Sequence, residues 1–141
     1  LVDRIMSPNG TVVKGSKAER VRRAVSGETS RALREMLTTV VDQGTGRRAQ
    51  IPNYAVAGKT GTALVAVGGS YRRDRRYNAS FVGFAPAGEP RLVIVAMLQN
   101  PKPYYYAGLT AAPLFQKVMM QTLLYRKIPP QGTASVSRAM D

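Results

Sequence analysis

The sequence predicts an α+β fold in which an antiparallel sheet is flanked by helices. Two stretches carry apolar residues with a helical period, and three strand-length stretches follow one another closely between them. Strands joined by short connections usually pair antiparallel. With 141 residues, of which 44% are hydrophobic, the chain has room for one domain with a core of its own.

The first predicted elements are a hairpin and a helix. A Pro-Asn-Gly turn signal at residues 8–10 predicts a β-hairpin over residues 2–14. A helix is predicted over residues 27–43, with Ser26 as its N-cap and Gly44 ending it in the left-handed conformation. Its apolar residues recur at helical spacing and form one stripe, which we expect to pack in the core. The stripe consists of Leu33, Met36, Leu37, Val40 and Val41.

Three strands and a second helix follow. The strands are predicted over residues 54–62, 77–85 and 91–99, and the last is apolar at nearly every position, which predicts that both of its faces are covered. The second helix is predicted over residues 110–126, with Thr110 as its N-cap. Its inward stripe is expected to comprise Phe115, Val118, Met119, Thr122 and Leu123.

Prolines and small polar residues near the C-terminus divide the chain into a domain over residues 1–126 and a tail over residues 127–141. The chain contains neither cysteine nor histidine. This excludes disulfides, thiolate sites and a Ser-His-Asp triad, so we expect no metal and no cofactor. No apolar run approaches the roughly 18 residues that a membrane-spanning helix needs. Any anchor or export signal is therefore expected outside this sequence.

The formal net charge of +13 suggests an anionic partner, and a basic binding module for nucleic acid or a wall polymer is one alternative. The basic residues lie mainly in predicted loops and not along one helix face, so we expect no nucleic-acid partner. A Gly-Thr-Gly-Arg-Arg segment at residues 44–48 could cradle a phosphate, but no helix opens directly after it. General solubility is the favoured explanation of the charge, because net charge alone says little about partners.

The segment with the most chemical content is Val-Ala-Gly-Lys-Thr-Gly-Thr-Ala at residues 56–63. Because strand residues alternate between faces, Thr60 and Thr62 share one face, and Lys59 points to the other face or over the strand edge. Gly61 leaves the backbone accessible to a ligand. A cation, two hydroxyls and an accessible backbone suit a carboxylate ligand and a developing oxyanion.

Together with its surroundings, this segment resembles the C-terminal part of a class B penicillin-binding protein, and the division type more than the elongation type. In that family a Lys-Thr-Gly box is the third active-site signature, after Ser-x-x-Lys and Ser-Asp-Asn boxes. The resemblance covers about residues 1–130. Besides the box it is carried by residues 8–10, 40–46, 78–86 and 111–115.

The resemblance implies a serine D,D-transpeptidase of the penicillin-binding/β-lactamase-like fold, which crosslinks peptidoglycan stem peptides and is acylated by β-lactams. Lys59 would tune the electrostatics and help to move protons, while Thr60 and Thr62 would bind a carboxylate. The N–H of Thr62 would form half of the oxyanion hole, and Gly61 would keep the cleft open. The site would lie at the extracytoplasmic face of the bacterial membrane, and other cell-wall synthesis or division proteins are candidate partners.

The chain departs from this pattern in lacking a nucleophile, because no serine is followed by a lysine three residues later. The Ser-x-Asn match at residues 7–9 falls on the predicted hairpin turn. We therefore expect the nucleophile in an upstream remainder of the domain, with strand 91–99 paired to that remainder and this chain inactive alone. A β-lactamase or β-lactam sensor of the same fold remains an alternative.

Overall fold

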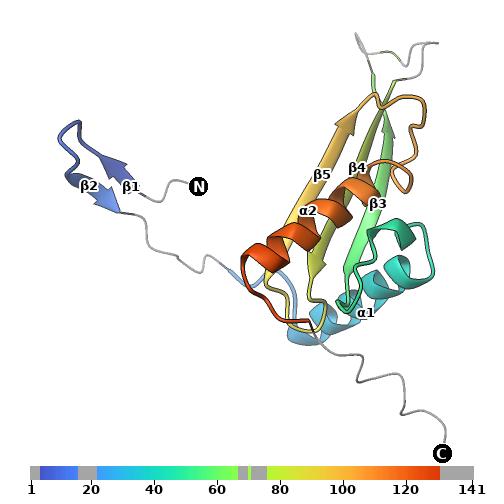
Figure 1. The fold of residues 1–141 in the computed structure, drawn as a ribbon, viewed down its shortest axis with the longest axis horizontal. Coiled ribbons are helices and arrows are strands. Elements are labelled where there is room, and N and C mark those ends of the chain that lie inside the picture. Colours follow the sequence, from blue (N-terminus) through green and yellow to red (C-terminus); the bar gives the residue numbers. More distant parts are fainter. Residues whose placement is uncertain (1–3, 16–21, 67–69, 71–75, 131–141) are drawn as a thin grey trace, which may run out of the picture.

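The computed structural model describes residues 4–15, 22–66, 70 and 76–130. They form a two-stranded sheet, a three-stranded sheet, two α-helices and one short 3-10 helix (Figure 1). Every strand pair is antiparallel, which confirms the predicted α+β class. The first residues of the predicted hairpin and residues 131–141 of the predicted tail lie outside the described residues.

The N-terminal hairpin pairs β1 (Arg4–Met6) with β2 (Val12–Gly15). The Ser7 N–H donates to the Thr11 carbonyl at 2.9 Å, which closes the loop between them. Gly10 has a φ of 83°, a left-handed conformation that glycine adopts at little cost. Figure 1 shows the hairpin lying apart from the other elements.

The second sheet has the order β3-β4-β5, with β3 over Ala57–Leu64, β4 over Tyr77–Ala85 and β5 over Leu92–Gln99. The residue pairing runs without a register shift along both ladders. β4 occupies the predicted residues, whereas β3 begins three residues later than predicted. The preceding residues instead form a turn closed by an isolated bridge between Ile51 and Tyr54.

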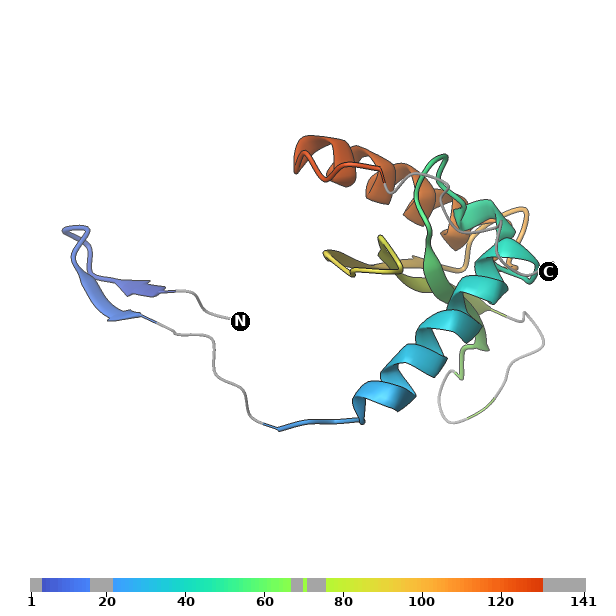
Figure 2. The same cartoon turned by 90° about the horizontal axis from the view of Figure 1, so that it is seen from below.

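Helix α2 (Ala111–Tyr125) lies along one face of this sheet, as Figures 1 and 2 show, and the core fills the space between them. The rings of Phe81 on β4 and Phe115 on α2 are both fully buried, with centroids 4.6 Å apart. Glycines make this approach possible. A Cβ on Gly58 would lie 2.6 Å from the Phe81 ring, and one on Gly83 would lie 2.8 Å from both rings.

Thr110 occupies the N-cap position of α2 as predicted, but its hydroxyl makes no capping hydrogen bond and donates instead to the Tyr106 carbonyl at 2.9 Å. The predicted inward stripe of α2 is wrong at one position. Val118 is 42% exposed, because the buried side of α2 follows a spacing of four residues from Ala111. The buried residues of α2 are Ala111, Ala112, Phe115, Met119 and Leu123.

Helix α1 (Gly27–Asp42) begins as predicted, since the Ser26 hydroxyl accepts the Thr29 N–H at 3.0 Å. Its end differs from the prediction. Gly44 does not adopt a positive φ, and its N–H donates to the Val40 carbonyl at 3.1 Å. Glycine is required here for a steric reason, because a Cβ at this position would lie 2.9 Å from that carbonyl oxygen.

The prediction that the whole apolar stripe of α1 packs in the core is also wrong for the described residues. Only Val41 is buried, whereas Leu33 is 44% and Met36 is 64% exposed. Figure 2 shows α1 crossing beside β3 on the other side of the sheet from α2. Only the last turn of α1 therefore reaches the core, and its first turns extend beyond the described sheet.

Strand β5 is covered on one face only, so the prediction of two covered faces is wrong for the part of the chain that the structure describes. Leu92, Ile94, Ala96 and Leu98 alternate toward α2, and Ala96 is buried. The opposite face, which we call the open sheet face, presents four exposed apolar side chains. These are Val82 at 46%, Val93 at 70%, Val95 at 63% and Met97 at 58% exposure.

Candidate active site at the edge of strand β3

Strand β3 is paired only with β4 and so forms an edge of the described sheet. Leu64 is paired with Tyr77, so the next pair along the ladder is Val65 with Arg76. This next pair is hydrogen-bonded, because the Val65 N–H donates to the Arg76 carbonyl at 2.8 Å. Because hydrogen-bonded and non-bonded pairs alternate in an antiparallel ladder, the N–H groups of Thr60 and Thr62 point away from β4. The backbone of both residues is therefore presented at the open edge.

Lys59 lies at this same edge. Its ammonium donates to the Thr60 carbonyl at 3.1 Å and to the Thr60 hydroxyl at 3.2 Å, and the side chain is exposed. Of the two orientations left open by the sequence, the side chain thus takes the one over the strand edge. The arrangement places a positive charge beside an outward-facing backbone, which favours an anionic ligand.

The hydroxyls of Thr60 and Thr62 are both engaged by donors from the protein. The Thr62 Oγ1 accepts the Ala107 N–H at 3.2 Å, and the Thr60 Oγ1 accepts from Lys59 and lies 2.9 Å from the Thr45 Oγ1. An ammonium and a backbone N–H can only donate. The Thr62 hydroxyl therefore keeps its proton for a carboxylate, and the Thr60 hydroxyl keeps its own if Thr45 is the donor of their shared hydrogen bond.

Gly61 has a steric role that the sequence did not indicate. A Cβ at this position would lie 2.6 Å from the Oγ of Ser80, its cross-strand neighbour on β4. The Ser80 hydroxyl donates to the Gly61 carbonyl at 3.4 Å. The missing side chain thus makes room for the Ser80 hydroxyl.

Thr45 and Ala107 contact the site although the sequence did not identify either as a site residue. Thr45 lies in the turn after α1, and Ala107 lies in the loop between β5 and α2. The sequence signals at Thr45 were its position between two glycines, interpreted as a weak phosphate cradle, and its place in segment 40–46, which carries part of the resemblance. Ala107 acts through its backbone, which leaves no signature in the side-chain pattern.

Two tyrosines of the loop that contains Ala107 stack with a tyrosine of β4. The rings of Tyr77 and Tyr105 are 4.3 Å apart, and those of Tyr105 and Tyr106 are 4.4 Å apart, with nearly parallel planes in both pairs. Tyr77 is the first residue of β4 and pairs with Leu64, the last residue of β3. The stack therefore ties the loop to the end of the sheet and supports the position of Ala107.

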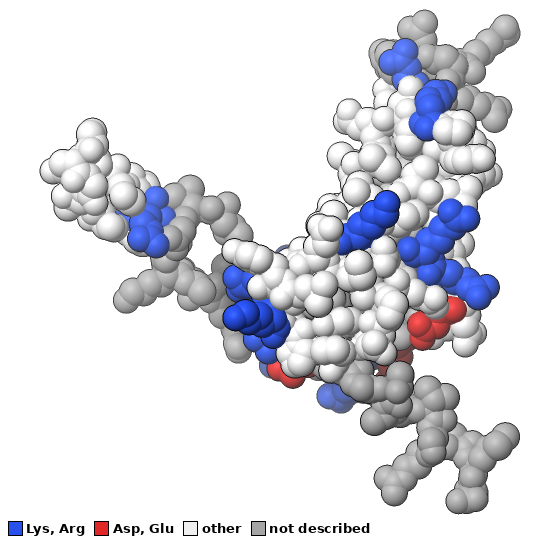
Figure 3. All heavy atoms as spheres, in the orientation of Figure 1, with Lys and Arg blue, Asp and Glu red and all other residues white. Residues whose placement is uncertain are grey.

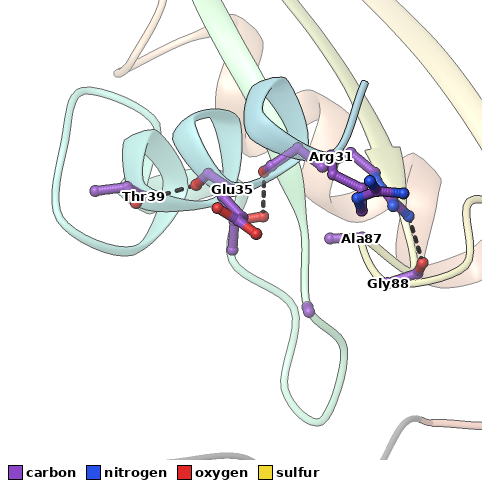
Figure 4. A pocket seen from close by; sticks show the side chains of 8 residues that line it. Arg31, Glu35, Thr39, Ala87 and Gly88 are labelled. Carbon is purple, nitrogen blue, oxygen red and sulfur yellow. Dashed lines mark hydrogen bonds between the residues drawn. The ribbon is translucent and has the colours of Figure 1, made fainter. Parts of the chain in front are cut away.

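Two hollows in the described surface lie elsewhere. One, of about 450 Å³, lies between α1 and the turn after β4 that contains Ala87 and Gly88 (Figure 4). An Arg34 guanidinium nitrogen donates to the Gly88 carbonyl at 2.6 Å. The other, of about 630 Å³, is lined by Asp42, Arg47 and Tyr54 among others. Neither of these two hollows is lined by residues of β3.

The remaining charged side chains of the described residues form neither a basic patch on the face visible in Figure 3 nor a metal-binding cluster. Figure 3 shows the described lysines and arginines scattered over the visible face instead of gathered in one patch. Among residues 4–15, 22–66, 70 and 76–130, no three acidic side chains lie close enough together to hold a metal ion. The distribution gives no support to a basic binding surface on this face.

Comparison with known proteins identifies relatives of this chain. Residues 1–120 match the family described as the penicillin-binding protein transpeptidase domain. A probable peptidoglycan D,D-transpeptidase, PbpC of Pseudomonas aeruginosa, is 40% identical over 86% of this chain. Stage V sporulation protein D of Bacillus subtilis is 39% identical over 78% of this chain.

Solved structures show the same fold. Penicillin-binding protein 3 from Mycobacterium tuberculosis, in complex with ampicillin, superimposes with a TM-score of 0.78 at 33% identity over 95% of this chain. The chain spans only part of these proteins. It covers 22% of PbpC, 17% of the sporulation protein and 32% of the Mycobacterium tuberculosis chain.

Proposed function

Because this chain belongs to the transpeptidase domain family of penicillin-binding proteins, we propose that it supplies the Lys-Thr-Gly strand of a serine D,D-transpeptidase. The complete enzyme would crosslink peptidoglycan stem peptides and be acylated by β-lactams. The open edge of β3 carries this proposal. There Lys59, two hydroxyls and an outward backbone N–H converge, which is the donor set that an acyl-transfer reaction on a carboxylate-bearing peptide requires.

In the proposed reaction a serine hydroxyl attacks the carbonyl of the penultimate D-alanine and forms an ester, while the terminal D-alanine leaves. An amine of a second stem peptide then displaces the serine and completes the crosslink. Thr60 and Thr62 hold the terminal carboxylate, and the Thr62 N–H stabilises the oxyanion that develops on the attacked carbonyl. Lys59 stabilises negative charge and assists proton transfer.

The nucleophile is proposed to come from residues outside this sequence, because none of its serines has a lysine three residues later. Chemistry on peptidoglycan places the site on the extracytoplasmic side of the membrane. Within the described ranges, no helix combines the length and the apolar character needed to cross a bilayer. A role in cell division, with other wall-synthesis proteins as partners, is the finer part of this proposal.

The proposal is tested by covalent labelling. The complete polypeptide that contains this chain is incubated with fluorescent penicillin, digested and analysed by mass spectrometry. We expect one labelled serine, located outside residues 1–141, and no label on the isolated chain. A Thr39→Val variant controls for a threonine-to-valine change away from the site and should label like the wild type, because the Thr39 hydroxyl donates to the Glu35 carbonyl on an exposed part of α1.

The outcomes separate the candidate functions. A long-lived acyl-enzyme supports a transpeptidase, whereas rapid release of hydrolysed penicillin indicates a β-lactamase. A stable adduct without crosslinking of a stem-peptide substrate indicates a sensor. Label within residues 1–141 would show that the nucleophile assignment is wrong, and a folded protein that takes no label would favour a binding module.

The open sheet face and the outer edge of β5 are proposed to pack against the remainder of the domain. The Asn100 N–H donates to the Tyr77 carbonyl at 2.7 Å, so alternation along the ladder directs the N–H groups of Val93, Val95 and Met97 outward. The side chains of the same three residues lie on the open sheet face. An apolar edge of this kind aggregates if it stays unpaired.

We therefore predict slow amide hydrogen exchange at Val93, Val95 and Met97 in the complete polypeptide. Protection should match that of Ile94, whose N–H faces β4 and serves as the internal reference. Exchange at the rate of an unstructured peptide at the three residues, with Ile94 still protected, would show that the edge is unpaired.

A further inference from the structure

The Gly-Thr-Gly turn after α1 places a hydroxyl directly against the candidate site. The Thr45 Oγ1 lies 2.9 Å from the Thr60 Oγ1, and either atom could be the donor. Thr45 is 15 residues away from Thr60 in the sequence and belongs to no helix or strand. The contact therefore depends on how the turn is held.

Hydrogen bonds and close packing hold this turn. The N–H groups of Gly44 and Gly46 both donate to the Val40 carbonyl, each at 3.1 Å, so both neighbours of Thr45 are tied to the end of α1. A Cβ on Gly46 would lie 3.1 Å from that carbonyl oxygen and 3.3 Å from the Phe81 ring. The turn thus sits directly on the core, and a Cβ at Gly46 would fit only if its neighbours shifted by a few tenths of an ångström.

The loop before α2 supports Thr45 from the other side. A Cβ on Gly108 would lie 2.8 Å from the Thr45 carbonyl oxygen. The preceding residue, Ala107, donates its N–H to the Thr62 hydroxyl. One loop therefore contacts both Thr45 and Thr62, and these contacts link the Gly-Thr-Gly turn to the two threonines of β3.

Counting donors and acceptors shows what each direction of the Thr45–Thr60 hydrogen bond would leave for a ligand. A hydroxyl has one proton and two acceptor lone pairs, and Lys59 must occupy one lone pair of Thr60 because an ammonium only donates. If Thr60 donated to Thr45, its single proton would be consumed. If Thr45 donates, both lone pairs of Thr60 are occupied and its proton is available for a ligand.

We propose that Thr45 is a positioning residue that donates its proton to Thr60 and so directs the Thr60 hydroxyl proton to the carboxylate of the bound peptide or β-lactam. This inference rests on the proposed function. Thr45 itself need not touch the ligand. Its contribution is to fix the direction of a hydrogen bond that a freely rotating hydroxyl would otherwise make only part of the time.

The test measures acylation of the complete polypeptide by benzylpenicillin for the wild type, Thr45→Val and Thr45→Ser. We expect Thr45→Val to weaken the initial, non-covalent complex by about five- to tenfold, the effect of impairing one hydrogen bond to a charged group. The rate constant of the acylation step should change little. Thr45→Ser keeps the hydroxyl and should restore wild-type binding, and Thr39→Val should behave as wild type.

A double-mutant cycle separates this role from a merely structural one. In a Thr60→Val background the additional Thr45→Val change should have almost no effect on binding, because the residue through which Thr45 acts is gone. An equal loss in both backgrounds, or no loss in the wild-type background, would overturn the inference. A wild-type protein that is not acylated at all would instead refute the proposed function.

Discussion

Replacing Lys59 by alanine is expected to lower the second-order rate constant of acylation by about 10²- to 10⁴-fold, the range for losing a group that assists proton transfer. The Lys59 ammonium contacts both the carbonyl and the hydroxyl of Thr60 at the open edge of β3. Its removal takes away a cation that contacts that edge and one of the donors to the Thr60 hydroxyl. The rate is measured by stopped-flow quenching or by time-resolved labelling with fluorescent penicillin.

Two further variants make this result specific. Lys117→Ala removes an exposed lysine on α2 and should leave the acylation rate unchanged. Lys59→Arg keeps the charge but replaces a compact ammonium by a planar fork, so we expect a partial loss. If Lys59→Ala acylates like the wild type while remaining folded, Lys59 has no part in the chemistry and the candidate site is misplaced.

The elements and the chemical motif of this chain could be predicted because both depend on local sequence. Ser26 precedes a helical stripe, and β4 alternates between a face that packs on α2 and a face that does not. Strand alternation predicts that Thr60 and Thr62 share a face, but it left open whether Lys59 points to the other face or over the strand edge. Periodicity therefore predicted the fold class correctly, whereas the site was predicted from the Lys-Thr-Gly motif and the family resemblance.

Periodicity does not state what covers an apolar face. Met36 and Val95 sit on apolar stripes that predicted burial, yet both are exposed in the described residues, because cover depends on elements distant in sequence. Gly44 shows a related failure. A glycine after a helix suggests a left-handed cap, but the close approach of the Val40 carbonyl explains its identity here.

Long-range contacts account for the part of the site that was missed. Thr45 reaches Thr60 only because the turn after α1 folds back on the core, and Ala107 reaches Thr62 only because the loop before α2 returns to the sheet. Neither contact has a fixed spacing in the sequence. Such contacts can be found only once the strands and the loops have been placed in space.

Phe81→Ala is expected to destabilise the complete protein by about 3–5 kcal/mol, the cost of removing a buried aromatic ring and leaving a cavity. Phe81 is fully buried and packs against Phe115 between sheet and helix. The ring is bordered by Gly58 and Gly83, which have no side chain that could move into the cavity left by its removal. A protein stabilised by only about 5–15 kcal/mol should lose much of its margin.

The measurement is thermal and denaturant unfolding of the complete polypeptide, with penicillin labelling as a probe of the folded site. Leu124→Ala is the control, since Leu124 lies on α2 beside buried Leu123 but is 64% exposed, and surface changes rarely exceed about 0.5 kcal/mol. Because Phe81 also contacts Gly46 in the turn that carries Thr45, we expect labelling to fall before global unfolding. If Phe81→Ala and Leu124→Ala are equally stable, the Phe81–Phe115 contact does not anchor the core. In that case it also does not hold β3 and the Thr45 turn in place.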